Sequence, residues 1–250
     1  GYGRIASTIP DIVEQPVRRT IDMIAAHKIR KVLTSLGIDE IITYSLLSKN
    51  LLAMAGISDR DYVEITNPLS VEEEIMRPSL MPGLLNAIVW NINRKTKDLK
   101  LFELGNIYSK ESADKFSERR SLCIGMTGEI SGSWVSGACN RQCGFFDIKG
   151  VLEVLLAELG VHDFSLKEIK DPRFSATARA SIEINDVPIG VMAEVSAKIL
   201  DGFDIKDKVY ALEIGIETVL RHSSIEKHFK ELPKYPSASR DMSIIVEKKS

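Results

Sequence analysis

The clearest pattern in the chain is a stripe of apolar residues at helical spacing, which starts at Ile21 in the segment Gln15–Ser35. Gly37 follows the stripe and is a suitable stop for a helix. Met23 and His27 fall on the opposite face. We therefore predict a helix over Gln15–Ser35 that buries one face. The stripe consists of Ile21, Ile24, Ala25, Ile29, Val32, Leu33 and Leu36.

Two further stretches have helical periodicity. The first runs over Pro82–Arg94, and proline is tolerated in the first turn of a helix. The second begins at Asp147, a good N-cap residue, and ends at Gly160. The inward residues of the Pro82–Arg94 helix are predicted to be Leu84, Leu85, Ile88, Val89 and Ile92.

Elsewhere the hydrophobic pattern changes to a period of about two, which is typical of strands. Asn185-Asp186 separates two such runs and predicts a hairpin turn. Strands joined mainly by hairpins, with a few long helices, predict an α+β fold with an antiparallel sheet flanked by helices. The predicted strands are Glu40–Leu47, Leu99–Tyr108, Ser121–Thr127, Ser181–Asn185, Val187–Val195 and Lys208–Glu217.

Composition is that of a globular protein. The 250 residues are 44% hydrophobic and 27% charged, and 33 Lys and Arg against 35 Asp and Glu give a net charge of −2. This balance argues against a surface that coats nucleic acid, so any RNA contact is expected to be local. No apolar run approaches the ~20 residues that span a bilayer. We therefore expect a soluble, cytoplasmic protein that does not contact membranes.

The chain ends predict a piece of a longer polypeptide. The chain starts at Gly1 rather than at a methionine. Asp241–Glu247 has the pattern of a strand, and the chain stops three residues after it. A lone strand needs neighbours for its backbone groups. Pro233–Pro236 is the expected connection between domains.

No motif with a known chemical mechanism stands out. The histidines lack metal-ligand spacing, and neither a nucleophile motif nor a phosphate-binding glycine loop is present. Glu72-Glu73-Glu74 is read as a solvated helix start rather than an acid–base site. Cys139 and Cys143 lack further ligands, so reduced thiols are favoured over a metal site. The histidines are His27, His162, His222 and His228.

One segment carries a family resemblance. Residues 67–85 read NPLSVEEEIMRPSLMPGLL and are followed by Asn93-Arg94 and by LFELG at 101–105. Further matches are YGRI at 2–5, IITYS at 41–45, FFDIKG at 145–150 and the proline, arginine and aspartate of 236–241. In this order they resemble the bacterial phenylalanyl-tRNA synthetase β-subunit family over essentially the whole chain. The stretch Asp171–Arg179 departs from the family's His-Pro-Gly-Arg-Ser-Ala-like turn, which puts any role of that turn in doubt.

The resemblance implies a class II aminoacyl-tRNA synthetase-like core without catalytic residues. In this family the working site, which binds ATP and phenylalanine, lies in the α subunit. The stretch Tyr210–Arg221 has one glycine, and Glu213 and Glu217 would repel phosphates. Arg221 is read as facing solvent. Arg77 and Glu103 are the only substrate-binding candidates, and we favour a structural role in which Arg77 pairs with an acid to fix the next helix.

The resemblance also implies a division of the chain and its partners. Residues 1–14 would be the exit of a DNA-binding-like domain, 15–228 the core, and 229–250 the start of a ferredoxin-like anticodon-binding domain. The family's magnesium ligands and its editing pocket would precede Gly1, so no metal or cofactor is expected here. ATP and magnesium would serve the complete enzyme, an αβ heterotetramer that charges tRNA(Phe).

Three functions remain open from the sequence. The leading one is a structural core that assembles with the α subunit through the face of the first helix that carries Met23 and His27. The second is a module that binds an amino acid or nucleotide as a sensor, and the third is an active stand-alone ligase. Arg94-Lys95-Thr96-Lys97 and Arg119-Arg120 are candidate tRNA phosphate contacts, although such runs are usually solvated faces.

Overall fold

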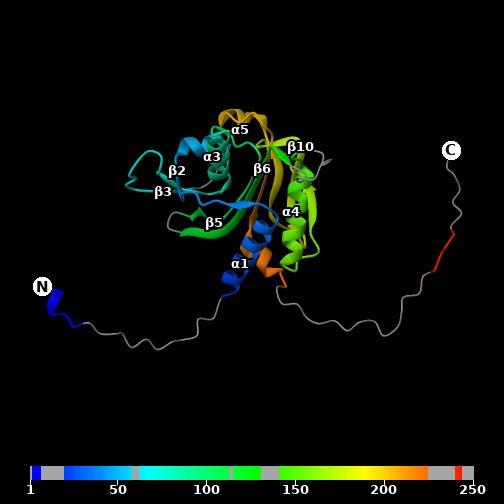
Figure 1. The fold of residues 1–250 in the computed structure, drawn as a ribbon, viewed down its shortest axis with the longest axis horizontal. Helices are drawn as coiled ribbons and strands as arrows, with labels where there is room; N and C mark the ends of the chain where they lie inside the picture. Colours follow the sequence, from blue (N-terminus) through cyan, green and yellow to red (C-terminus); the bar gives the residue numbers. More distant parts are fainter. Residues whose placement is uncertain are drawn as a thin grey trace.

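A computed structural model describes residues 2–6, 20–57, 62–112, 115–130, 141–224 and 240–243. Its centre is a seven-stranded sheet of order β1-β5-β6-β12-β11-β10-β9 (Figure 1). Neighbouring strands are antiparallel except for a two-residue parallel pairing of β1 with β5. The strands are β1 (Asp39–Glu40), β5 (Leu99–Ser112), β6 (Lys115–Thr127), β9 (Ser165–Glu168), β10 (Phe174–Ile184), β11 (Val187–Val195) and β12 (Val209–Gly215).

Short elements complete the fold. A small antiparallel sheet joins β2 (Leu46–Leu47), β4 (Ile75–Met76) and β3 (Val63–Glu64), and β7 (Glu129–Ile130) pairs with β8 (Arg141–Gln142). The helices are η1 (Tyr2–Arg4), α1 (Ile21–Ser35), α2 (Lys49–Met54), α3 (Met81–Ile92), α4 (Phe145–Glu158), α5 (Ala197–Gly202) and α6 (Ile216–Arg221).

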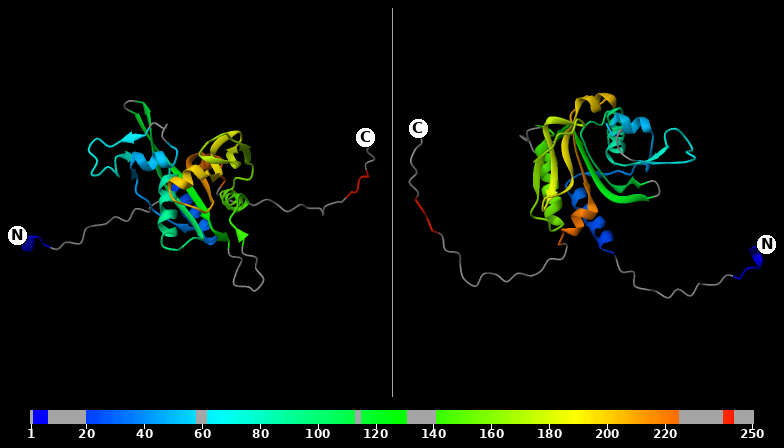
Figure 2. Two further views of the ribbon diagram at one scale, coloured as in Figure 1. Left: turned by 90° about the horizontal axis from the view of Figure 1, so that it is seen from above. Right: turned by 180° about the vertical axis from the view of Figure 1, so that it is seen from behind.

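Helices cover both faces of the large sheet, so the molecule has three layers (Figures 1 and 2). One hydrophobic core lies between the sheet and α1, α4 and α6, and the other between the sheet and α2, α3 and α5. Successive β6 residues alternate between them: Leu122 and Ile124 belong to the first core and Cys123 to the second. The predicted antiparallel sheet flanked by helices is confirmed.

The predicted first helix is confirmed over α1. Thr20 caps it by accepting a hydrogen bond from Met23 N at 3.3 Å, and Gly37 ends it with a φ of +73°. Residues 15–19 of the prediction lie outside the described residues. The stripe is buried only in part, because Ile21 and Ile24 are exposed. The first turn of α1 extends beyond the strands in Figure 1.

Two other helices are confirmed with one change. α3 carries Pro82 in its first turn, as predicted. The N-cap of α4 is Gly144 rather than Asp147, and Asp147 sits three residues further on, where its carboxylate accepts a hydrogen bond from Gly144 N at 2.8 Å. An acidic side chain in the first turn stabilises the helix dipole as well as the terminal N–H group, so both positions suit aspartate.

Two strand predictions and one predicted helix start were wrong in detail. The predicted strand Glu40–Leu47 breaks into β1 and β2, because Thr43 between them bonds inward to Glu103. The predicted strand Lys208–Glu217 ends at Gly215, where α6 begins. Glu72–Glu74 precede strand β4 instead of starting a helix. The hairpin prediction is confirmed: Asn185 and Asp186 join β10 to β11 with φ values of +51° and +61°.

Asp147 makes stability depend on pH. Arg141 donates to its Oδ2 at 2.6 Å, and this hydrogen bonding lowers the pKa of the Asp147 carboxyl. A lowered folded-state pKa adds stability above the unfolded value of about 3.9, and this stability is lost as the pH falls through and below that value. We expect Asp147→Asn to destabilise the chain at pH 6 and to cost much less at pH 3, measured by urea unfolding. Asp163→Asn, in an exposed loop, is the control; an equal cost of Asp147→Asn at both pH values would contradict the prediction.

Two thiols are shielded by the fold. Cys123 and Cys143 are unpaired and buried, and burial raises the pKa of both, that of Cys143 to about 11. The thiolate is the reactive form of cysteine. In a Cys139→Ser variant we therefore expect no thiol to react with a disulfide reagent in the native protein at neutral pH, and both to react after unfolding. A rapid native reaction would show that one of them opens to solvent.

Candidate functional site

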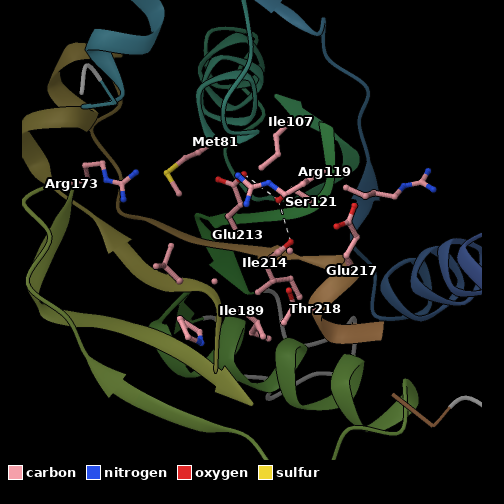
Figure 3. Close-up of a pocket in the computed structure, with 15 residues that line it drawn as sticks. Met81, Ile107, Arg119, Ser121, Arg173, Ile189, Glu213, Ile214, Glu217 and Thr218 are labelled. Carbon is pink, nitrogen blue, oxygen red and sulfur yellow. Dashed lines mark hydrogen bonds between the residues drawn. The ribbon is translucent and has the colours of Figure 1, made fainter. Parts of the chain in front are cut away.

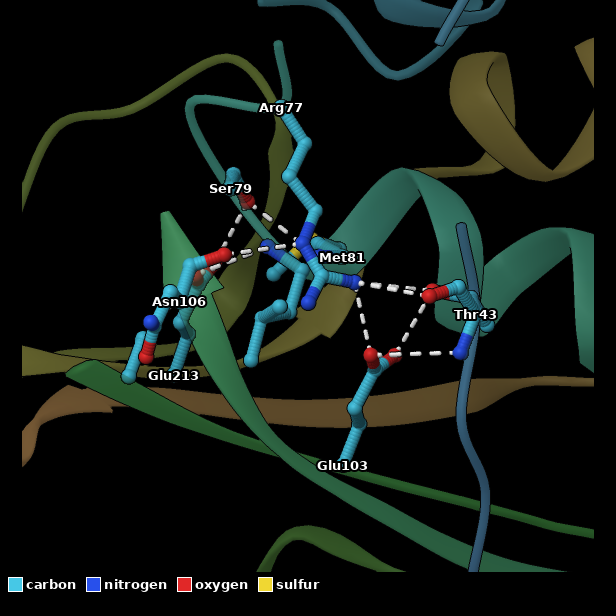
Figure 4. A network of polar contacts seen from close by, with 9 residues as sticks. Thr43, Arg77, Ser79, Met81, Glu103, Asn106 and Glu213 are labelled. Atoms are coloured by element: carbon cyan, nitrogen blue, oxygen red, sulfur yellow. Dashed lines mark hydrogen bonds and ion pairs between the residues drawn. The ribbon is translucent and has the colours of Figure 1, made fainter. Parts of the chain in front are cut away.

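A buried ion pair joins the two residues singled out in the sequence. Arg77 follows β4, and its Nη1 lies 2.6 Å from Oε1 of Glu103 on β5; both side chains are about 5% exposed or less. Arg77 Nε also donates to the carbonyl of Asn106 at 2.9 Å. Gly105 leaves room for this guanidinium, because a Cβ there would lie 3.3 Å from Arg77 Cζ. Arg77 and Glu103 therefore hold each other (Figure 4).

Thr43 completes the network from a third segment. Its hydroxyl donates to Glu103 Oε2 at 2.7 Å and accepts from Arg77 Nη1 at 3.0 Å, and its N–H donates to Glu103 Oε1 at 3.2 Å. Thr43 thus points into the protein. Its neighbours Ile42 and Tyr44 are 91% and 82% exposed. The ion pair therefore fixes a segment that presents two large apolar side chains outward.

Glu213 on β12 performs a second structural task. Its carboxylate accepts hydrogen bonds from Ser79 Oγ at 2.5 Å, Leu80 N at 3.0 Å and Ser121 Oγ at 3.2 Å. Leu80 is the N-cap residue of α3 and provides no side-chain cap of its own. Glu213 therefore caps the N-terminus of α3 from strand β12. Its negative charge interacts favourably with the positive end of the helix dipole.

A cavity of about 270 Å³ lies beside Glu213 (Figure 3). Its charged lining comes from Arg119 and Arg120 on β6, Arg173 before β10, and Glu213 and Glu217. Apolar side chains complete the wall, among them Met81, Ile107 and Ile189. The two acids predicted to oppose phosphate binding both border this cavity.

Two of the cavity's cations have contacts within the chain. Arg173 pairs with Asp171, whose Oδ1 lies 3.0 Å from its Nε, and Arg119 donates to Ser109 Oγ at 3.2 Å. Arg221 lies exposed in the last turn of α6 and is absent from the cavity lining. Phosphoryl chemistry needs several positive groups directed at one anion. This lining instead combines three arginines with two glutamates.

The remaining candidates are dispersed. Arg94 stacks on Trp90, its Cζ 3.5 Å from the ring centroid, at the end of α3. His27 and His162 are exposed, and the Nδ1 of His222 lies 2.9 Å from the carbonyl of Thr218. His228 lies outside the described residues. Within the part of the chain that the structure describes, no group of three or more His, Cys, Asp or Glu could hold a metal ion, and no helix is long and apolar enough to cross a bilayer.

The family described as phenylalanyl tRNA synthetase beta chain CLM domain matches residues 5–216. The chain belongs to this family. Among curated relatives, the phenylalanine–tRNA ligase beta subunit of Clostridium tetani is 29% identical over 99% of the chain. That of Fusobacterium nucleatum is 31% identical over 99%, and that of Carboxydothermus hydrogenoformans is 31% identical over 89%. The chain spans only 30%, 31% and 28% of these relatives' own lengths.

The fold of this CLM domain chain is also that of a known synthetase. A crystal structure of pyrrolysyl-tRNA synthetase from Desulfitobacterium hafniense matches with a TM-score of 0.62 and 18% identity, covering 81% of this chain and 69% of that one. A second structure of that organism's enzyme matches equally well. Pyrrolysyl-tRNA synthetase is a class II synthetase, so the predicted class II-like core is confirmed as a fold.

Sequence reasoning missed the capping role of Glu213 in this CLM domain chain. It treated Glu213 only as an obstacle to phosphate binding. The partners, Ser79 and Leu80, lie more than 130 residues away in the chain. The one local signal was that α3 starts without a Ser, Thr, Asp or Asn at its N-cap.

Proposed function

We propose that the chain is the core-like domain of the β subunit of phenylalanine–tRNA ligase, a cytoplasmic enzyme that charges tRNA(Phe) with phenylalanine. The observation that carries this proposal is the family match over residues 5–216. ATP and magnesium would serve the complete enzyme, and the reaction would take place in the α subunit of an αβ heterotetramer. Contact with tRNA would come mainly from domains outside this chain.

Within that enzyme we assign the domain a structural role without catalytic or substrate-binding residues. The pairing of Arg77 with Glu103 supports this assignment, because each is the other's partner rather than a free group for ATP or an amino group. Glu213 supports it too, since its carboxylate is taken up by the start of α3. Purified chain is expected to give no phenylalanine-dependent pyrophosphate exchange; measurable exchange would contradict this role.

The surface that would contact the α subunit lies on α1 and the segment after β1. Met23, Ile42 and Tyr44 are more than half exposed, and large exposed apolar residues in such numbers are typical of interfaces. Arg77, Glu103 and Thr43 hold the segment of Ile42 and Tyr44 in place. A rigid apolar surface lowers the entropic cost of association.

Co-purification with the matching α subunit, followed by the mass of the complex in solution, tests this role. We expect a stable complex, weakened about tenfold or more by Tyr44→Ser. Leu69→Ser is the matched control, because Leu69 is 96% exposed in a different loop. A complex that tolerates Tyr44→Ser, or no complex at all, would remove the architectural role from this surface.

The sensor function is the alternative, and the acids in the cavity lining disfavour a nucleotide there. Calorimetric titration with ATP, with phenylalanine and with both tests it. We expect no saturable heat from any of the three. Saturable heat would favour the sensor over an inert core.

A further inference from the structure

The exposed side of α3 differs from that of the other long helices. Four exposed residues recur there every three or four positions, so they share one face. Residues 75–97 contain no Asp or Glu, whereas α1 and α4 both include acidic residues. Asparagine favours helices less than the Glu, Lys or Gln suited to exposed helix positions, so helix propensity does not explain this face. The four residues are Asn86, Trp90, Asn93 and Arg94.

Arg94 is held in one orientation at the end of this face. Its Cζ lies 3.5 Å from the centroid of the Trp90 ring, and its Nη1 donates to the Trp90 carbonyl at 3.0 Å. Both residues are exposed, Trp90 by 54%. A guanidinium plane is a surface on which nucleic-acid bases stack. A side chain that is ordered before binding also loses less conformational entropy in a complex.

Two lysines extend the positive charge beyond Arg94. Lys95 and Lys97 follow within three residues, so their Cα atoms lie within about 10 Å of that of Arg94. All three cations are exposed, and among the described residues none of them forms an ion pair, whereas many other surface cations do. The next acid, Asp98, accepts a hydrogen bond from Glu129 N at 2.7 Å. The three charges are therefore available to an anion.

The backbone of Lys95 is a second, independent observation. Lys95 has a φ of +68°, and its N–H donates to the carbonyl of Ile92 at 2.9 Å. The N–H of Thr96 donates to the carbonyl of Asn91 at 3.1 Å. Glycine is the usual residue at a helix end of this kind, because a Cβ is strained at positive φ. A lysine there lowers stability, which favours a role for its charge.

The combination of groups favours RNA over an acidic protein surface. Arginine and lysine bind phosphates, and asparagine amides bind base edges. An RNA strand presents phosphates and flat bases next to one another, which matches cations that lie beside a stacked guanidinium. In the proposed enzyme the RNA at hand is the tRNA substrate.

We propose that the α3-end surface, formed by Trp90, Arg94, Lys95 and Lys97, contacts tRNA. The three cations bind phosphates, and Trp90 holds the guanidinium of Arg94 against a base. The inference rests on the proposed function. It adds one local contact from this domain to those made by other domains, in keeping with a net charge of −2 for the chain.

The triple variant Arg94→Gln/Lys95→Gln/Lys97→Gln, made in the complete αβ enzyme that contains this chain, tests the proposal. We expect the dissociation constant for tRNA to rise about tenfold or more at ~0.1 M salt. The slope of log affinity against log salt should become shallower by about two to three, roughly one for each lost phosphate contact. Phenylalanine-dependent pyrophosphate exchange, measured without tRNA, should be unchanged.

The matched control is Lys170→Gln/Lys198→Gln/Lys206→Gln, which removes three exposed lysines from other parts of the chain. It changes the net charge equally and is expected to alter the dissociation constant for tRNA less than twofold. An equal loss in both triple variants would reduce the effect to overall charge and overturn the proposal. Unchanged tRNA binding in the α3-end variant would overturn it as well, and weaker association with the α subunit in its place would identify a protein contact.

Lys95→Gly separates binding from folding. Glycine suits a φ of +68°, so this variant is expected to raise the midpoint of urea unfolding of the chain. At the same time it should weaken tRNA binding severalfold and make the salt slope shallower by about one. A Lys95→Gly enzyme that binds tRNA like wild type would overturn the proposal even if the triple variant does not fold.

Failure of the proposed function has a different result. A wild-type αβ complex that gives no phenylalanine-dependent pyrophosphate exchange and does not charge tRNA contradicts the proposed function. An active wild-type complex whose α3-end variants bind tRNA normally contradicts only the present inference. The two failures are therefore distinguishable.

Discussion

Replacing Arg77 with methionine is expected to destabilise the chain by about 3–5 kcal/mol, because it leaves the Glu103 carboxylate buried without its counter-charge. Glu103 is only 3% exposed, and Thr43 would be its remaining polar partner. Methionine keeps the unbranched apolar stem and most of the volume of the side chain, so the main losses are the counter-charge of Glu103 and the hydrogen bonds of Arg77 to Asn106 and Thr43. Urea unfolding at neutral pH measures it.

Two further variants separate the pair from its surroundings. The double variant Arg77→Met/Glu103→Leu removes both charges and is expected to be more stable than Arg77→Met alone, since no unpaired charge stays buried. Arg119→Met is the control for losing one arginine and should stay within about 0.5 kcal/mol of wild type. A double variant less stable than Arg77→Met would show that the hydrogen bonds of Glu103 to Thr43 outweigh its charge.

Gly190→Ala is expected to destabilise the chain by about 3 kcal/mol or more. The added methyl group would overpack the space between the paired strands β11 and β12. Gly190 lies on β11 opposite Ile214 of β12. A Cβ at Gly190 would lie 2.7 Å from Ile214 Cα and still closer to the carbonyl oxygen of Glu213. Both atoms belong to the backbone of a central strand, so relief requires separating β11 from β12. The midpoint of urea unfolding measures the effect.

Gly150→Ala is the matched control. Gly150 lies inside α4, and a Cβ there would meet nothing within 4 Å. Alanine is favoured over glycine within a helix by about 0.5–1 kcal/mol, so this variant should be more stable than wild type. Equal and small effects at both positions would mean that β11 and β12 can separate at little cost.

Local sequence was informative wherever one element has one buried face. The spacing of apolar residues located α1 and α3, and Asn185-Asp186 located the β10–β11 turn, because side-chain period and turn conformation depend on near neighbours in the chain. The same reasoning failed at Glu40–Leu47. There the alternating pattern is real, but Thr43 is drawn inward by two side chains that lie 34 and 60 residues away.

The family resemblance supplied what periodicity could not. Short motifs in a fixed order predicted a class II-like core, and the family match over residues 5–216 confirms the family. Motifs do not say which side chains touch. For Arg77 and Glu103 the sequence favoured a structural role over substrate binding but did not identify the partner of Arg77; their 2.6 Å contact is a property of how β4 and β5 are placed.

Sequence therefore established the α+β class, the main helices and the family, since these follow from periodicity and from ordered motifs. The roles of the charged residues became clear only from their contacts in the tertiary structure. Glu213 became a helix cap and Arg77 a buried counter-ion, whereas the buried Nε of Arg120 has no hydrogen-bond partner among the described residues. The energy of a buried charge depends on the few groups within about 4 Å, and these come from segments far apart in the chain.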